Sequence, residues 1–217
     1  MIGKNGVIST KEFLENKSGS TYTITGSLTD NNGEFSGFSA ANYITTNASV
    51  SANSSKLEVY GSYTTKSDVT TEQYVCCTLT RNLAVTVING KFRLQVSSNN
   101  GSGWNNLIVG TSTVSANTKY YFKIISDNTN IRLYVLINNV WVLQATVAIS
   151  GTFTTTTFGF GNHLPTKVAP TLGYVNIKDY IIKINGIITW TGVDAYLTND
   201  KAKINKNYIG SLDFYES

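Results

Sequence analysis

Residues 83–96 read "LAVTVINGKFRLQV", two runs of alternating residues on either side of Asn89-Gly90. This pattern predicts a β-hairpin closed by a type I′ turn, because both central residues of that turn need positive φ, which Asn and Gly tolerate. Pairing outward from the turn gives one apolar face made of Leu83, Val85, Val87, Phe92, Leu94 and Val96. The alternate residues, Ala84, Thr86, Ile88, Lys91, Arg93 and Gln95, should form a mostly solvated face. The hairpin is therefore expected to cover a core on one side.

Two further hairpins are expected from the same kind of turn. In "GYVNIKDYIIKINGIITWTG" (173–192), Asn185-Gly186 should pair Ile184 with Ile187, Lys183 with Ile188 and Ile181 with Trp190. In "LYVLINNVWVLQ" (133–144), the turn falls at Asn138-Asn139. One face then carries Val135, Ile137, Val140 and Val142, and the other carries Tyr134, Leu136, Trp141 and Leu143. Because both faces are apolar, we expect this hairpin to lie centrally in its sheet.

Other short runs indicate further strands separated by turn residues at short intervals. They cover 38–44, 56–63, 73–80, 107–112, 119–125, 147–149 and 158–161. Many short strands with frequent turns are typical of a β-sandwich. Residues 9–16 have the pattern of a capping box, with Ser9 three residues before Glu12, and predict one or two helical turns.

Composition supports this class of fold. The 217 residues are 41% hydrophobic, 12% aromatic and 14% charged, which indicates a β-rich globular chain. The formal net charge is +4, and the basic residues are too dispersed for a nucleic-acid surface, so no nucleic-acid partner is expected. The sequence has no secretory signal pattern and no long apolar run, which predicts folding in the cytosol and no membrane partner. Cys76 and Cys77 are adjacent on an expected strand and should not form a disulfide with each other.

The order of four segments resembles a known family. "GFSAANYITT" is followed by "NGKFRLQVSSNNGSGWNNL", "ANTKYYFKI" and finally "GYVNIKDYIIKINGIITW". Together they are similar to the concanavalin A-like, laminin-G-like jelly-roll modules of bacteriophage structural proteins, such as head, neck or tail-fibre proteins. The resemblance covers about residues 38–192 and implies an all-β, concanavalin A-like sandwich of two antiparallel sheets. It also implies that the closing strand returns beside the first one, with Asp179 at the rim.

The resemblance implies a place in a virion, after synthesis in the cytoplasm of a bacterial host. The expected partners are other virion proteins, further copies of this chain, and glycans of a cell surface or mucosa. Residues 36–217 are expected to form the sandwich. Residues 1–35 should be an attachment segment, or should add an edge strand through "TYTITGSL" (21–28).

Catalytic chemistry has little support in the sequence. A retaining glycosidase needs two carboxylates about 5 Å apart, and no two acids alternate along an expected strand. The single histidine, His163, has no second histidine or thiolate at ligand spacing, so no metal site and no resident cofactor are predicted. Calcium remains open at Asp68 or Asp127, although each lacks a second carboxylate nearby.

The candidate ligand-binding residues are therefore aromatic and amide side chains. Trp104 follows a loop that contains Asn100 and precedes Asn105, a combination that suits stacking and hydrogen bonding to sugars. Tyr134, Trp141 and Arg132 share one expected face, which is either a ligand surface, an interface or core packing. His163 is either a local loop residue or a contact at the rim of the site.

The resemblance thus implies a non-enzymatic, lectin-like protein that decorates a bacteriophage particle or adheres to host or mucosal glycans. The alternative is a carbohydrate-active enzyme or its substrate-binding module. Two paired carboxylates in a groove of the structure would favour that alternative.

Overall fold

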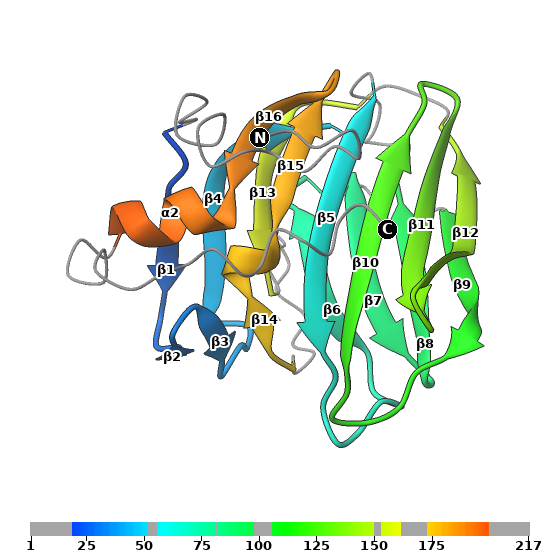
Figure 1. Ribbon diagram of the computed structural model, residues 1–217, viewed down its shortest axis with the longest axis horizontal. Helices are drawn as coiled ribbons and strands as arrows, with labels where there is room; N and C mark the ends of the chain where they lie inside the picture. Colours follow the sequence, from blue (N-terminus) through cyan, green and yellow to red (C-terminus); the bar gives the residue numbers. More distant parts are fainter. Residues whose placement is uncertain are drawn as a thin grey trace.

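The computed structural model describes residues 19–51, 56–80, 82–97, 106–149, 153–161 and 173–199. In these ranges the chain forms a sandwich of two large antiparallel sheets (Figure 1). The predicted all-β fold class with two antiparallel sheets is confirmed. In the view of Figure 1 the six-stranded sheet lies in front and the seven-stranded sheet behind it.

The seven-stranded sheet has the order β1-β4-β13-β6-β7-β8-β9. Its strands are β1 (Tyr22–Thr25), β4 (Tyr43–Val50), β6 (Gln73–Thr78), β7 (Leu83–Ile88), β8 (Lys91–Val96), β9 (Asn106–Thr113) and β13 (Thr156–Phe160). The six-stranded sheet has the order β12-β11-β10-β5-β15-β16. Its strands are β5 (Leu57–Thr64), β10 (Lys119–Ser126), β11 (Asn130–Ile137), β12 (Val140–Ala148), β15 (Ile181–Ile184) and β16 (Ile187–Thr191).

A small third sheet and two short helices complete the described fold. The sheet has the order β14-β3-β2, from β2 (Thr29–Asn31), β3 (Glu34–Ser36) and β14 (Val175–Asn176). The 3-10 helix η1 (Ile177–Asp179) leads into β15, and the helix α2 (Gly192–Asn199) follows β16. The sequence did not lead us to expect α2.

The registers of two predicted hairpins are confirmed. β7 and β8 pair from Leu83 with Val96 through Ile88 with Lys91, and β11 and β12 pair Ile137 with Val140 and Tyr134 with Leu143. The turn residues Asn89-Gly90, Asn138-Asn139 and Asn185-Gly186 all have positive φ, as the type I′ turn requires. Local turn chemistry therefore set these pairings.

The third hairpin differs from the prediction by one residue. Lys183 pairs with Ile188 and Ile184 with Ile187 as expected, but a bulge then pairs Ile182, instead of Ile181, with Trp190. The extra residue is Thr189, whose hydroxyl donates to the carbonyl of Ile182 at 3.2 Å. A bulge inserts one residue into one strand and shifts every later pair.

The expected position of the closing strand was also wrong. β15 pairs with β5 in the six-stranded sheet, whereas β1 lies at the edge of the other sheet. Trp190 still reaches the N-terminal part of the sandwich, because its indole N–H donates to the carbonyl of Thr21 at 3.1 Å. Asp179, expected at the rim, is 3% exposed and accepts a hydrogen bond from Ser62.

Three other expectations about strands need correction. The hairpin of 133–144 is not central, since β12 is the edge strand of its sheet and Val140 is 61% exposed. Residues 147–149 are not a separate strand, because β12 runs through Ala148. The strand predicted over 38–44 begins at Tyr43, after a turn in which Ser39 and Asn42 bond each other's backbone.

The polar face of the β7–β8 hairpin is not solvated as predicted. Ala84 and Thr86 are 0% exposed and Gln95 is 1% exposed. Strand alternation reports which side chains share a face, and it carries no information about what lies over that face.

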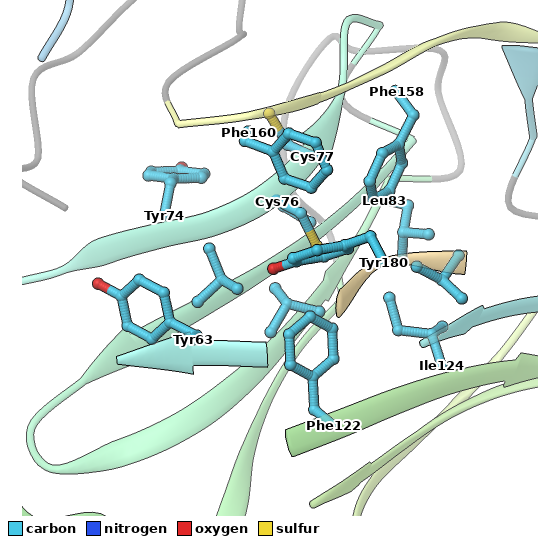
Figure 2. Packing of buried hydrophobic residues seen from close by; sticks show 14 of the residues in the cluster. Tyr63, Tyr74, Cys76, Cys77, Leu83, Phe122, Ile124, Phe158, Phe160 and Tyr180 are labelled. Carbon is cyan, nitrogen blue, oxygen red and sulfur yellow. The ribbon is translucent and has the colours of Figure 1, made fainter. Parts of the chain in front are cut away.

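The core between the sheets is rich in aromatic rings. Figure 2 shows Tyr180 between Phe122 of β10 and Phe160 of β13, and its ring centroid lies 5.9 Å and 4.5 Å from theirs. Gly61 of β5 leaves room for Tyr180, because a Cβ there would lie 2.3 Å from the ring. These rings join the two sheets through edge contacts, which aromatic pairs favour.

Residues near the N-terminus contribute to both the sandwich and the small third sheet where the structure describes them. β1 pairs with β4, so "TYTITGSL" supplies an edge strand, and Phe35 of β3 is fully buried. The helical turns expected over 9–16 and most of the possible attachment segment lie outside the described residues. The division between 1–35 and 36–217 stays a prediction.

Candidate functional site

Aromatic and basic side chains collect on the outer face of the six-stranded sheet. On β10, Phe122 and Ile124 are fully buried in the core, so the alternate residues Tyr121 and Lys123 point outward. The neighbouring strands place their outward residues beside them through the pairing of the sheet. We call this set the aromatic–lysine face: Glu58, Tyr60, Lys119, Tyr121, Lys123, Arg132, Tyr134, Trp141 and Lys183.

Lys123 lies at the centre of this face. The register places it directly opposite Tyr60 on one side and Tyr134 on the other. Its Nζ lies 4.4 Å from the centroid of the Trp141 ring and 5.4 Å from that of Tyr134. Ammonium groups at such distances from ring faces are attracted by the ring quadrupole. The lysine thus extends from β10 over the rings of β11 and β12.

The surroundings of Lys123 destabilise its protonated, charged form. Partial burial lowers the pKa of Lys123 below its ordinary value, and the nearby charge of Glu58 opposes that shift less strongly. Lys123 forms no ion pair with another described residue. Its ammonium group contacts two ring faces and is influenced by the nearby charge of Glu58.

Lys119 and Lys183 have different environments on the same face. Lys183 lies 5.3 Å from the Tyr60 ring centroid and directly opposite Glu58, which accepts a 2.8 Å hydrogen bond from the Tyr60 hydroxyl. Lys119 forms a 2.7 Å ion pair with Asp179. Burial lowers the pKa of Lys119, but the hydrogen bond and charge of Asp179 outweigh burial, so its pKa lies above the ordinary value.

The structure brings together three of the residues predicted from sequence. Arg132, Tyr134 and Trp141 are half-buried and lie on this one face, as their alternation predicted. Arg132 is turned toward the loop before β11, where it forms an ion pair with Asp127. Trp104, Asn105, Asn100 and His163 lie outside the described residues, so their predicted roles stay predictions.

Sequence reasoning missed Lys123, Tyr60 and Tyr121. The alternation in "KYYFKI" could have assigned Tyr121 and Lys123 to one face. Nothing local places β10 between β5 and β11, and that pairing is what surrounds Lys123 with tyrosines.

The two carboxylates considered for calcium organise local turns. Asp68 accepts hydrogen bonds from the backbone N–H of Thr70 and the hydroxyls of Thr70 and Thr71. Asp127 accepts from Arg132 and from Thr129, and these bonds hold the pKa of Asp127 well below its usual range. Within the described ranges, no group of three or more His, Cys, Asp or Glu side chains is placed to hold a metal ion. Calcium binding stays an untested expectation.

A second polar cluster lies on the outer side of the seven-stranded sheet. Arg93 forms an ion pair with Glu72 and donates to the hydroxyl of Thr86 at 3.2 Å. Gln95 donates to Glu72 at 2.7 Å and to Thr86 at 3.3 Å, while its buried Oε1 has no partner. We call these four residues the polar cluster. Its charges are paired with each other, in contrast to Lys123.

The described helices offer no membrane-spanning segment, because each is too short or too polar to cross a bilayer.

Among comparisons with known proteins, only the comparison with solved structures finds a similarity, and it is a similarity of fold. No protein-family model matches the chain, and no curated protein matches it. Solved structures of similar fold include the receptor-binding domain of botulinum neurotoxin C/D mosaic serotype, with 13% identity and a TM-score of 0.52. That match covers 87% of this chain and 48% of the other.

Two further botulinum neurotoxin structures are similar to the same extent. The serotype D binding domain has 12% identity and a TM-score of 0.54, and the match covers 87% of this chain and 48% of that one. The binding domain of the neurotoxin DC, in complex with SialylT, has 11% identity and a TM-score of 0.53, with 83% and 46% covered. This chain spans about half the length of these domains. The likeness shows that this chain shares a β-sandwich fold with part of these binding domains.

Proposed function

We propose that the chain is a non-catalytic saccharide-binding module and that the aromatic–lysine face is its binding surface. The observation that carries the proposal is the convergence of Trp141, Tyr134 and Lys123 from three different strands. Ligand sites in proteins combine apolar and aromatic surface with a few placed polar groups. The rings of this face offer stacking surface for the C–H side of a sugar, and the lysine offers a hydrogen-bond donor.

The rings are accessible enough for this role. Tyr134 and Trp141 are half-buried, and Leu143, directly opposite Tyr134, is 45% exposed. Core aromatics of this protein such as Phe122 and Phe160 are fully buried. The face therefore presents apolar surface that the sandwich itself does not use for its core.

Binding without catalysis is favoured over the enzyme alternative. Glu58 is held by the Tyr60 hydroxyl, Asp179 by Lys119 and Ser62, and Asp127 by Arg132. Canonical glycoside hydrolysis uses two carboxylates that flank the scissile bond. Here each of these three carboxylates is engaged by neighbouring side chains, and they lie on or before different strands, Glu58 on β5, Asp127 before β11 and Asp179 before β15.

The site of action in this proposal is a bacteriophage particle. This part rests on the similarity of the sequence segments to phage jelly-roll modules, and the receptor-binding role of the structurally similar domains agrees with adhesion. Immunogold labelling of intact particles would test it, because a protein that is only intracellular would leave them unlabelled.

A glycan array followed by calorimetry tests the binding role. We expect Trp141→Ala to lower saccharide affinity about tenfold, since a stacked ring contributes on the order of 1 kcal/mol. The variant should keep a cooperative melting transition, because the ring is only half-buried.

Tyr174→Ala is the matched control. Tyr174 is also an exposed aromatic residue, 42% accessible, but it pairs with Thr64 at the Lys119 end of the aromatic–lysine face, where β5, β10 and β11 separate it from Trp141 on β12. Its removal should leave affinity unchanged. If Trp141→Ala binds as tightly as the wild type and melts several degrees lower, the ring serves packing and the proposal fails.

A further inference from the structure

The cations on the aromatic–lysine face do not all have a matching carboxylate. Arg132 pairs with Asp127, Lys119 pairs with Asp179, and Lys183 lies opposite Glu58. Lys123 differs because both of its cross-strand neighbours are tyrosines. Glu58 lies diagonally from Lys123, opposite Ile125, and its hydrogen bond from Tyr60 directs it within its own strand.

We propose that this face selects acidic saccharides, meaning sugars that carry a carboxylate or a sulfate, and that Lys123 Nζ is their anion contact. This inference rests on the proposed saccharide-binding function and adds the class of ligand. Its basis is the position of a half-buried ammonium group between ring faces, without an ion pair among the described residues.

Electrostatics favours an anion at this position. Taking an ammonium group partly out of water costs free energy, and ring faces return only part of it. The lowered pKa of Lys123 reflects this cost, with burial as its first cause. A ligand carboxylate or sulfate would supply a counter-charge in direct contact with the ammonium group, in a site where partial burial strengthens the attraction.

The geometry also gives such a ligand an orientation. Lys123 Nζ lies within 4.4 Å of the Trp141 centroid, and Leu143 lies across from Tyr134 on the same side of the sheet. An acidic group bound at Nζ therefore leaves the rest of the sugar beside the Trp141 and Tyr134 rings and Leu143. Charge and stacking surface are close enough for one or two sugar residues to use both.

The test compares neutral saccharides with their acidic counterparts. An array should carry each neutral saccharide beside its sialylated, uronic-acid and sulfated forms, and calorimetry should follow with lactose, sialyllactose and sulfated lactose. We expect the wild type to prefer the acidic forms about tenfold, the effect of one charge-assisted contact. The sialylated and sulfated probes separate the two sources of negative charge.

Variants of Lys123 assign the contact. Lys123→Met keeps an apolar stem over the rings and should abolish the preference, so that neutral and acidic sugars bind with equal affinity. Lys123→Arg should restore the preference, because it keeps the cation. Lys183→Met removes a lysine from the same face, 5.3 Å from the Tyr60 centroid, and should leave the preference intact.

Each other outcome has a defined meaning. Equal binding of neutral and acidic sugars by the wild type overturns the inference and leaves the proposed function standing. No binding to any saccharide overturns both. Equal losses in Lys123→Met and Lys183→Met would show a general charge effect and overturn the assignment to Lys123. A Lys123→Met variant that melts lower but keeps the preference would show that the lysine is a packing element.

Discussion

The outer faces of the two large sheets differ in how their charged residues are paired. On the seven-stranded sheet, the polar cluster pairs Arg93 with Glu72 and surrounds them with Thr86 and Gln95, both almost fully buried. On the six-stranded sheet, Lys123 is half-buried against Tyr134 and Trp141 and has no ion pair among the described residues. The first arrangement satisfies its charges internally, and the second keeps a cation available to a ligand.

This contrast distinguishes charged residues that stabilise the fold from a charged residue that is available to bind a ligand. A buried charge with a bonded partner supports the fold, because removing one member leaves the other unpaired. A cation packed on aromatic rings contributes less to stability and gains more from an external anion. Substitutions on the polar cluster should therefore change stability, and substitutions on the aromatic–lysine face should change binding.

The largest expected effect is on the polar cluster. Arg93→Met should lower the free energy of unfolding by about 2 kcal/mol, because it leaves Glu72 without its cation at a partly buried position. Denaturant unfolding measures this change. The matched control is Arg132→Met on the other face, whose ion pair with Asp127 is more exposed. That variant should lose much less stability, because solvent screens an exposed ion pair, and a loss equal to or larger than that of Arg93→Met would contradict the comparison.

A smaller effect is expected in the pH dependence of stability. The pKa of Lys123 lies below the ordinary 10.5 in the folded protein. At pH values between the folded pKa of Lys123 and 10.5, the unfolded chain binds more protons than the folded chain. The contribution of Lys123 to stability therefore rises with pH in this range. Lys119 has a raised pKa, so its contribution is complete below 10.5 and is lost as pH rises through the folded value. Unfolding profiles of Lys123→Met and Lys119→Met, each subtracted from the wild type, should have opposite slopes. Slopes of the same sign would contradict the two environments.

The smallest effect concerns the two cysteines. Cys76 and Cys77 are buried and form no disulfide, so thiol reductant should leave the melting temperature unchanged. Cys76 pairs with Val85, whose side chain is in the core, whereas Cys77 pairs with Ala84 on the side of the polar cluster. Burial raises the pKa of the Cys76 thiol, which further slows alkylation. Both thiols should react only upon global unfolding. Rapid alkylation of Cys77 in native buffer would show that the outer face of the seven-stranded sheet opens in solution.

Much of the local structure could be predicted from the sequence, and the predictions that failed show which features depend on tertiary packing. The turns at Asn89, Asn138 and Asn185 and the first pairs beside each turn were predicted correctly. The bulge at Thr189 was missed because it depends on how Trp190 packs against both the core and Thr21. The candidate site was predicted in part: Arg132, Tyr134 and Trp141 share a face, but the pairing of β10 with β11, which brings Lys123 to them, was not predicted, and Tyr60 comes from β5, which is distant in sequence.

The sequence by itself determined the all-β class, the three hairpin turns and which neighbouring side chains share a face, because these depend on backbone conformations and alternation within a few residues. Only the tertiary structure decided that β10 lies between β5 and β11, that the β11–β12 hairpin lies at an edge, and that the polar side of β7 and β8 is buried. These features depend on pairings such as those of β5 with β10 and with β15, which join strands far apart in the chain. The order of the strands is set by the joint packing of both sheets around Phe122, Phe160 and Tyr180, to which no local pattern is sensitive.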